Sequence, residues 1–176
     1  MKAFKSDYNH FLDSFFIDSK NESAFEFVDA FLKKPSERPE GMSGWFNFNP
    51  LYIYGQAGSG KTHLINAIVH DMLVAHKKVH YTTSKGFMGN YIKALMYNEV
   101  AEMRLFYRNI DILVVEDIQF LGRKTKCQEE MTHTLIDRFE NKKLTIFSSR
   151  IHPNKLKHFD EWLSSRLGMG LAIEIV

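Results

Sequence analysis

The sequence predicts an α/β domain in which a parallel β-sheet carries helices on both faces. Short apolar runs alternate along the chain with longer segments whose apolar residues recur every three or four positions. The short runs are apolar at nearly every position, which is typical of strands in a parallel sheet. Strands that alternate with crossover helices pair in parallel. With 176 residues, of which 44% are apolar, the chain can bury the core of one domain of ordinary size.

The expected elements follow one another in a regular order. They are a helix at 24–32, a strand at 51–54 (LYIY), a helix at 63–76, a strand at 79–82 (VHYT), helices at 86–96 and 99–108, a strand at 111–115 (DILVV), a helix at 128–140, and strands at 144–148 (LTIFS) and 171–176 (LAIEIV). Four of these helices place apolar residues on one face. These sets are Phe27, Ala30 and Phe31; Leu64, Ile68 and Met72; Phe87, Tyr91 and Leu95; and Met131, Leu135 and Phe139.

Residues 33–44 (KKPSERPEGMSG) interrupt this alternation. They combine prolines, glycines and charges of both signs, a composition typical of a loop or linker. We therefore expect an N-terminal segment at 1–48 and the main domain at 49–176.

Composition excludes several classes of protein. Lys and Arg number 23 and Asp and Glu number 21, so the formal net charge is +2 and any basic surface must be local. The single cysteine, Cys127, allows no internal disulfide, which favours a reducing compartment. Apolar runs stay short of the ~18 residues of a membrane helix, and the N-terminus lacks the apolar core of a signal peptide. We expect a cytoplasmic protein without a membrane span.

A glycine-rich loop lies between the first strand and the helix that follows it. The residues from Gly55 to Thr62 (GQAGSGKT) match the phosphate-loop pattern G-x-x-x-x-G-K-[ST] in the strand–loop–helix context that this pattern requires. The glycines allow backbone N–H groups to turn toward an anion at a helix N-terminus. We expect Lys61 to reach the β and γ phosphates and the hydroxyl of Thr62 to hold Mg²⁺.

Two carboxylates, Glu116 and Asp117, follow the buried strand at 111–115. The carboxyl ends of parallel strands line the ligand crevice of such a fold. Beside a phosphate loop, one carboxylate can hold Mg²⁺ through water while the other polarises the attacking water. The alternative is an acid pair that only caps a helix.

Five segments together resemble one family. They are FLDSFFIDSKNESAF (11–25), NPLYIYGQAGSGKTHL (49–64), FYRNIDILVVEDIQFL (106–121), QEEMTHTL (128–135) and LSSRLGMGLAIEI (163–175). This set resembles the ATPase domain of the bacterial chromosomal replication initiators, the DnaA family, which is a branch of the AAA+ ATPases. The resemblance covers nearly the whole chain.

The resemblance implies a three-layer P-loop NTPase fold with a five-stranded parallel sheet in the order 5-1-4-3-2. It implies an ATP-switched protein that self-associates into a helical oligomer at an origin and engages single-stranded DNA. It also implies that slow ATP hydrolysis resets the switch, so we expect any ATPase activity to be weak. A replicative helicase or regulators of the initiator are possible further partners.

The resemblance also assigns site residues by position. The ATP-binding positions are Phe16, Ile17 and Asn21 in the segment that wraps the adenine, Gly55, Gly58, Ser59, Gly60, Lys61, Thr62 and His63 in and beside the phosphate loop, and Ser149 as a sensor. Thr62 and Glu116 are the magnesium positions, Asp117 is the catalytic acid, and Arg166 is an arginine finger that reaches the ATP of a neighbouring subunit. Ile92, in the initiator-specific helix pair at 86–108, and Lys126, in a basic loop with Arg123 and Lys124, match positions that contact single-stranded DNA.

The sequence departs from the family pattern at several positions. Glu116 replaces the usual Asp, and Ser149-Arg150 stands where the family has a polar sensor, usually Asp, followed by Arg. Ser149 could still contact the γ-phosphate, or Arg150 could replace the sensor by its charge. Trp162 replaces an Arg near the finger, and Asp18 replaces a Gly. These departures bear on hydrolysis more than on ATP binding.

Other functions are compatible with parts of this pattern. A relative that regulates the initiator or loads the helicase would also use the ATP site, and the chain ends at Val176, before the lid and helix-turn-helix that the family has. The insertion at 86–108 favours an initiator. A small-molecule kinase could use the same loop but would need an acceptor pocket and an Arg-rich lid.

Overall fold

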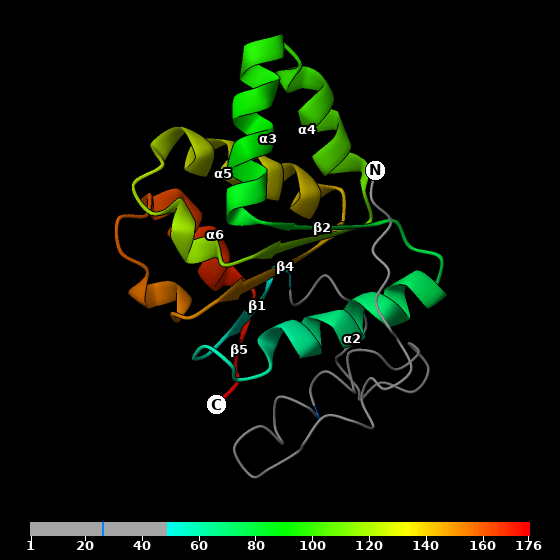
Figure 1. Cartoon of the computed structure of the whole chain (residues 1–176), viewed down its shortest axis with the longest axis vertical. Helices are drawn as coiled ribbons and strands as arrows, with labels where there is room; N and C mark the ends of the chain where they lie inside the picture. Colours follow the sequence, from blue (N-terminus) through cyan, green and yellow to red (C-terminus); the bar gives the residue numbers. More distant parts are fainter. Residues whose placement is uncertain (1–25, 27–48) are drawn as a thin grey trace.

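The computed structural model describes Glu26 and residues 49–176. Within this part of the chain, five strands form one parallel sheet in the order β2-β3-β4-β1-β5 (Figure 1). The strands are β1 (Leu51–Tyr54), β2 (Val79–Thr83), β3 (Ile112–Glu116), β4 (Leu144–Ser149) and β5 (Leu171–Glu174). From the other edge this order is 5-1-4-3-2, so the predicted topology is confirmed. The helix expected at 24–32, Glu26 apart, lies outside the described residues.

Helices cover both faces of the sheet, which gives the predicted three layers (Figure 1). One face packs against α2 (Lys61–Val74), and the other packs against α3 (Ser84–Tyr97), α4 (Val100–Asn109), α5 (Thr125–Glu140) and α6 (Glu161–Met169). Alternate strand residues divide between the two cores, as the pleat requires. In β1, Leu51 and Ile53 face α2, whereas Tyr52 faces the four-helix side.

Several element boundaries differ from the sequence-based expectation. Helix α5 begins at Thr125, so Lys126 lies in its first turn and not in a loop. Helix α6 was not expected, although its start has a clear signal, because the carboxylate of Asp160 accepts hydrogen bonds from the N–H groups of Trp162 and Leu163. Two short 3₁₀ helices, η3 (Ile118–Leu121) and η4 (Pro153–Lys155), were also not expected.

The predicted apolar faces are correct near the sheet and wrong at helix ends. Leu64, Ile68 and Met72 are buried against the sheet as expected. Leu95 is 55% exposed because it lies in the half of α3 that projects from the body together with α4 (Figure 1). Phe139 is 46% exposed at the end of α5. No helix among residues 49–176 combines the length and the apolar character that a membrane span requires.

Candidate nucleotide site

The glycine-rich loop connects β1 to α2 at the carboxyl edge of the sheet. Gly55, Gly58 and Gly60 all have positive φ, at 153°, 83° and 93°, which residues with a side chain rarely adopt. Gly55 is also a point of close approach between backbones, since a Cβ there would lie 1.9 Å from the carbonyl oxygen of Ile175. The Gly55 N–H donates to the carbonyl of Ser149, 3.2 Å away, and so ties the loop to the end of β4.

The Lys61 ammonium lies across this loop. It donates to the carbonyl oxygens of Gly55, at 2.8 Å, and of Gln56, and it is 3.4 Å from the hydroxyl of Ser59. Partial burial and the neighbouring positive charge of Arg150 lower the pKa of Lys61. The ammonium is therefore held beside the backbone that would surround a phosphate, and exposed Arg150 adds positive charge to the same edge.

Thr62 and Glu116 form the second part of the site. The Thr62 hydroxyl, in the first turn of α2, donates to Oε1 of Glu116 at the end of β3 over 2.7 Å. The two residues are 54 positions apart in the sequence. They meet because the ligand crevice of such a fold forms at the carboxyl ends of the parallel strands, as expected. Hydroxyl and carboxylate oxygens are hard ligands of the kind Mg²⁺ prefers, so the pair fits that ion.

Asp117, the next residue, is held in an uncommon backbone conformation. Its φ and ψ are 56° and 47°, the left-handed region, which Asp tolerates better than most residues but at a cost of about 1 kcal/mol or more. Two serines support it: the Ser84 hydroxyl donates to the Asp117 carbonyl at 2.6 Å, and the Asp117 N–H donates to the Ser148 hydroxyl at 3.2 Å. Strained residues of this kind concentrate at functional sites.

Gln119 connects the acid to the sensor position, and the sequence reasoning gave it no role. Its amide donates to Oδ1 of Asp117 at 2.9 Å, and its carbonyl oxygen accepts from the Ser149 hydroxyl at 3.0 Å. Ser149 is fully buried, and its hydroxyl oxygen accepts from the N–H of Ile151. The sequence does point to Gln119, because this residue lies in the family-specific IQF segment that follows Glu116 and Asp117.

The fold brings most of the predicted site residues to one edge of the sheet. These are Gly55, Gly58, Ser59, Gly60, Lys61, Thr62, His63, Glu116, Asp117 and Ser149, in or beside the ends of β1, β3 and β4. Phe16, Ile17 and Asn21 lie outside the described residues.

Arg166 lies elsewhere. It lines a shallow hollow with Asn49, Pro50 and Met169, beside the amino end of β1. The phosphate loop leaves the carboxyl end of the same strand, so the two sites are separated by the length of β1, about 13 Å for four residues.

The predicted DNA-contact residues are both exposed. Ile92 is 54% exposed on α3. The side chain of Lys126 is 79% exposed in the first turn of α5, with its ammonium 2.9 Å from the carboxylate of Glu129.

The parallel sheet, its strand order and the glycine-rich loop between β1 and α2 define a P-loop NTPase domain of the AAA+ type. The sequence matches the family described as the bacterial DnaA ATPase domain over residues 6–174. The chain therefore belongs to the DnaA ATPase-domain family.

Individual relatives agree with this assignment. The chromosomal replication initiator protein DnaA of Magnetococcus marinus is 34% identical over 171 residues, covering 96% of this chain and 36% of that protein. The chain thus spans about a third of the length of that relative.

Solved structures are similar over nearly the whole chain. Domain III of DnaA from Thermotoga maritima superposes with a TM-score of 0.85 at 29% identity, covering 98% of this chain and 69% of that one. AMPPCP-bound DnaA from Aquifex aeolicus superposes with a TM-score of 0.84 at 29% identity, covering 96% of this chain and 50% of that one. A replication initiator DnaA bound to AMPPCP and single-stranded DNA superposes with a TM-score of 0.82 at 30% identity, covering 94% of this chain and 49% of that one.

Proposed function

We propose that this chain binds ATP with Mg²⁺ and uses the bound nucleotide as a switch for self-association and for contact with single-stranded DNA during replication initiation. The observation that carries the proposal is the 2.7 Å contact between Thr62 and Glu116 beside the phosphate loop. It joins the two positions expected to hold the metal, although they lie on different elements. Bound AMPPCP in two similar DnaA structures supports the nucleotide assignment.

Each residue of the loop has a distinct task in this proposal. The backbone N–H groups of the loop and the Lys61 ammonium bind the phosphates, and Thr62 and Glu116 hold Mg²⁺, directly or through water. Bound Mg²⁺ would neutralise part of the negative charge of the phosphates. Lys61 must exchange its contacts with the carbonyls of Gly55 and Gln56 for phosphate oxygens.

Hydrolysis would be a slow reaction at the same site. A water oxygen bonds to the γ-phosphorus as the bond from that phosphorus to the β,γ-bridging oxygen breaks, and ADP leaves with the electron pair. Asp117 accepts the hydrogen bond of the attacking water and receives its proton, which then passes to the phosphate or to solvent. The fixed backbone of Asp117 sets the direction of its carboxylate for this task.

Arg166 would act on a neighbouring molecule. Its place beside the amino end of β1 keeps it away from the phosphate loop of its own chain. A contact between Arg166 and ATP therefore needs a second copy of the chain, docked head to tail, and repeated contacts of this type build an open helical assembly. The finger makes assembly depend on the nucleotide that is bound.

Single-stranded DNA would lie along the outer side of α3 and the start of α5. Ile92 offers an apolar side chain to bases and sugars, and Lys126 offers a charge to phosphate, the combination used by single-strand binders. Lys126 would exchange its contact with Glu129 for the phosphate.

The nucleotide site is tested by calorimetric titration of ATP and of ADP, with Mg²⁺, into the chain and into Lys61→Ala. We expect binding to the unchanged chain that is lost in the variant, because the loop then lacks its only lysine. Glu116→Gln should reduce the dependence of ATP affinity on Mg²⁺ while leaving metal-free affinity similar. Equal affinity in Lys61→Ala would refute the site assignment.

A further inference from the structure

We infer that Gln119 is a positioning residue, which fixes the Asp117 carboxylate for hydrolysis and links it to the sensor strand β4 through Ser149. The inference rests on the hydrolysis proposed above. Its basis is a chain of hydrogen bonds that crosses between two neighbouring strands, from the residue after β3 to the last residue of β4.

The orientation of the Gln119 amide follows from the donors and acceptors on its two sides. The backbone N–H of Ile151 can only donate, so the hydroxyl of Ser149, 3.0 Å away, accepts there. The hydroxyl of Ser149 donates to the carbonyl oxygen of Gln119, and it also contacts the phenol oxygen of Tyr52. The amide of Gln119 therefore faces Asp117, where its N–H donates to Oδ1. The opposite orientation would place the amide oxygen against a carboxylate, so the bonds fix one orientation.

The far end of this series of hydrogen bonds is tied to the core. Ile151 is held by Tyr52, whose hydroxyl donates to the Ile151 carbonyl at 2.9 Å. Tyr52 and Ser149 are both fully buried. Because the anchor lies in the core, it holds the amide of Gln119 in one place, and the amide in turn holds one oxygen of Asp117.

The consequence concerns the other carboxylate oxygen. With Oδ1 engaged by Gln119, Oδ2 is the oxygen left to accept the hydrogen bond of the attacking water. Ser149 then acts through Gln119, and a change at the end of β4 alters the direction of Asp117. Arg150, whose charge already acts on Lys61, is the next residue along and is placed to produce such a change.

The first test measures hydrolysis under single-turnover conditions, with the chain in excess over labelled ATP so that a slow rate suffices. Gln119→Leu and the isosteric Gln119→Glu both remove the donated N–H, and Gln119→Glu can still accept from Ser149. We expect both to keep ATP affinity within about twofold and to slow hydrolysis about tenfold to a hundredfold, the size of effect that a displaced reacting group produces. Ser149→Thr, which keeps the hydroxyl, should retain most of the rate that Ser149→Ala loses.

Double variants separate positioning from general structural damage. In the Asp117→Asn background, Gln119→Leu should cause no further loss, and Ser149→Ala should cause none in the Gln119→Leu background. Wild-type hydrolysis in Gln119→Leu together with loss in Asp117→Asn would overturn the role of Gln119. Retained hydrolysis in Asp117→Asn would overturn the catalytic role of Asp117 in the proposed function.

A second measurement needs no turnover. In the ¹⁵N-labelled chain, the side-chain amide of Gln119 should shift and exchange its hydrogens with water at least several times faster after Asp117→Ala or Ser149→Ala. Gln128, whose amide donates to the carbonyls of Leu121 and His158, is the matched control and should keep its signal. An unchanged Gln119 signal in both variants would overturn the inference.

Discussion

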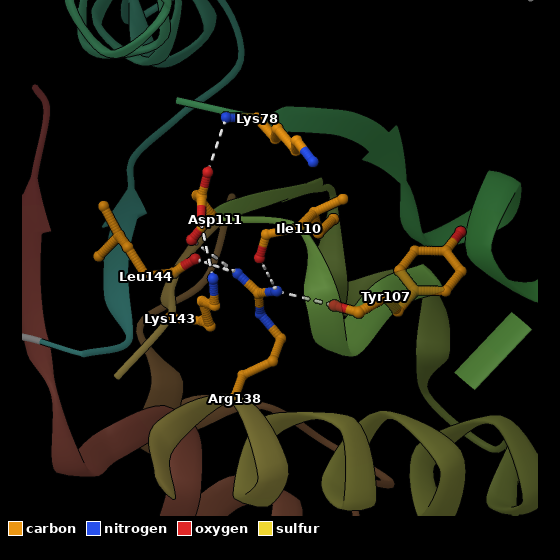
Figure 2. Close-up of polar contacts among 7 residues, drawn as sticks. All are labelled: Lys78, Tyr107, Ile110, Asp111, Arg138, Lys143 and Leu144. Carbon is orange, nitrogen blue, oxygen red and sulfur yellow. Dashed lines mark hydrogen bonds and ion pairs between the residues drawn. The ribbon is translucent and has the colours of Figure 1, made fainter. Parts of the chain in front are cut away.

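Arg138 is the most deeply buried charged side chain among the described residues, and its replacement by Met should lower the stability of the fold. The side chain is fully buried where α5 faces the amino ends of β3 and β4 (Figure 2). Its guanidinium donates to the hydroxyl of Thr145, at 2.9 Å, and to the carbonyls of Tyr107, Ile110, Asp111 and Leu144, at 2.7, 2.9, 3.3 and 2.5 Å. Burial lowers the pKa of Arg138 to about 10, which leaves it charged at pH 7.

The magnitude follows from what Met would leave behind. The carbonyls of Tyr107 and Ile110 lie at the end of α4, where carbonyls have no partner within the helix, and each buried acceptor without a donor costs about 1–3 kcal/mol. Met partly offsets this loss, because a buried guanidinium carries its own desolvation cost. We expect Arg138→Met to lower the free energy of unfolding by about 3–5 kcal/mol, the range found when one partner of a buried charge network is removed. Arg138→Lys keeps the charge but not the planar guanidinium, and its free energy of unfolding should fall by about half as much as that of Arg138→Met.

Urea unfolding followed by circular dichroism measures this loss. At a slope of about 2 kcal/mol per molar urea, the midpoint should fall by roughly 1.5–2.5 M. Lys126→Met is the control, because the side chains of the Lys126–Glu129 ion pair are 79% and 48% exposed and the pair should contribute under about 1 kcal/mol. A midpoint for Arg138→Met equal to that of Lys126→Met would refute the argument that the buried carbonyls need this donor.

Three further predictions concern single substitutions. Gly55→Ala should lower stability by about 3 kcal/mol or more and abolish ATP binding, because the new Cβ meets the carbonyl of Ile175; urea unfolding and calorimetry check this. Lys143 holds the pKa of Asp111 below its usual value, so the stability that Asp111 contributes is present above pH 4 and lost as the pH falls below it. Asp111→Asn should therefore be less stable than the unchanged chain at pH 7, and in urea titrations the difference should shrink steadily as the pH falls below 4. Arg166→Ala should bind ATP normally yet lower hydrolysis in the assembled protein by about a thousandfold, measured as ATPase rate against chain concentration; equal rates at all concentrations would contradict the finger role.

The sheet and the binding loop could be predicted because their signals are local. Apolar runs such as those at 51–54 and 111–115 identify buried strands without knowledge of the rest of the chain. The loop pattern contains its own context, with a strand before Gly55 and a helix after Thr62. The family resemblance supplied the strand order, which these local signals do not contain.

The remaining features depend on contacts between distant positions. The role of Gln119 is visible only when the ends of β3 and β4 are adjacent, because its partners are Asp117 and Ser149. The buried position of Arg138 could not be predicted for the same reason, since a lone Arg on a helix is usually exposed. Helix α6 has nine residues, contains a glycine and buries only Leu163 and Leu167, so its periodicity is weak.

Side-chain contacts hold the α3–α4 hairpin to the rest of the domain. Two arginines hold α4 to α5. Arg104 makes a bidentate contact with the buried carboxylate of Glu130, and Arg138 donates to carbonyls at the carboxyl end of α4. Helix α3 begins at Ser84 and carries Ile92, which is 54% exposed. These contacts tie α4 to α5, whereas Ile92 on α3 is exposed to solvent.

The start of α3 touches the nucleotide site directly. The hydroxyl of Ser84, its first residue, donates to the carbonyl of Asp117, and Thr83 caps the helix just before it. A rearrangement at Asp117 on binding or hydrolysis of ATP therefore acts on the first turn of the helix that presents Ile92. If ATP in this way strengthens the contact with DNA, DNA must strengthen the binding of ATP by the same factor, because linkage between two sites is reciprocal.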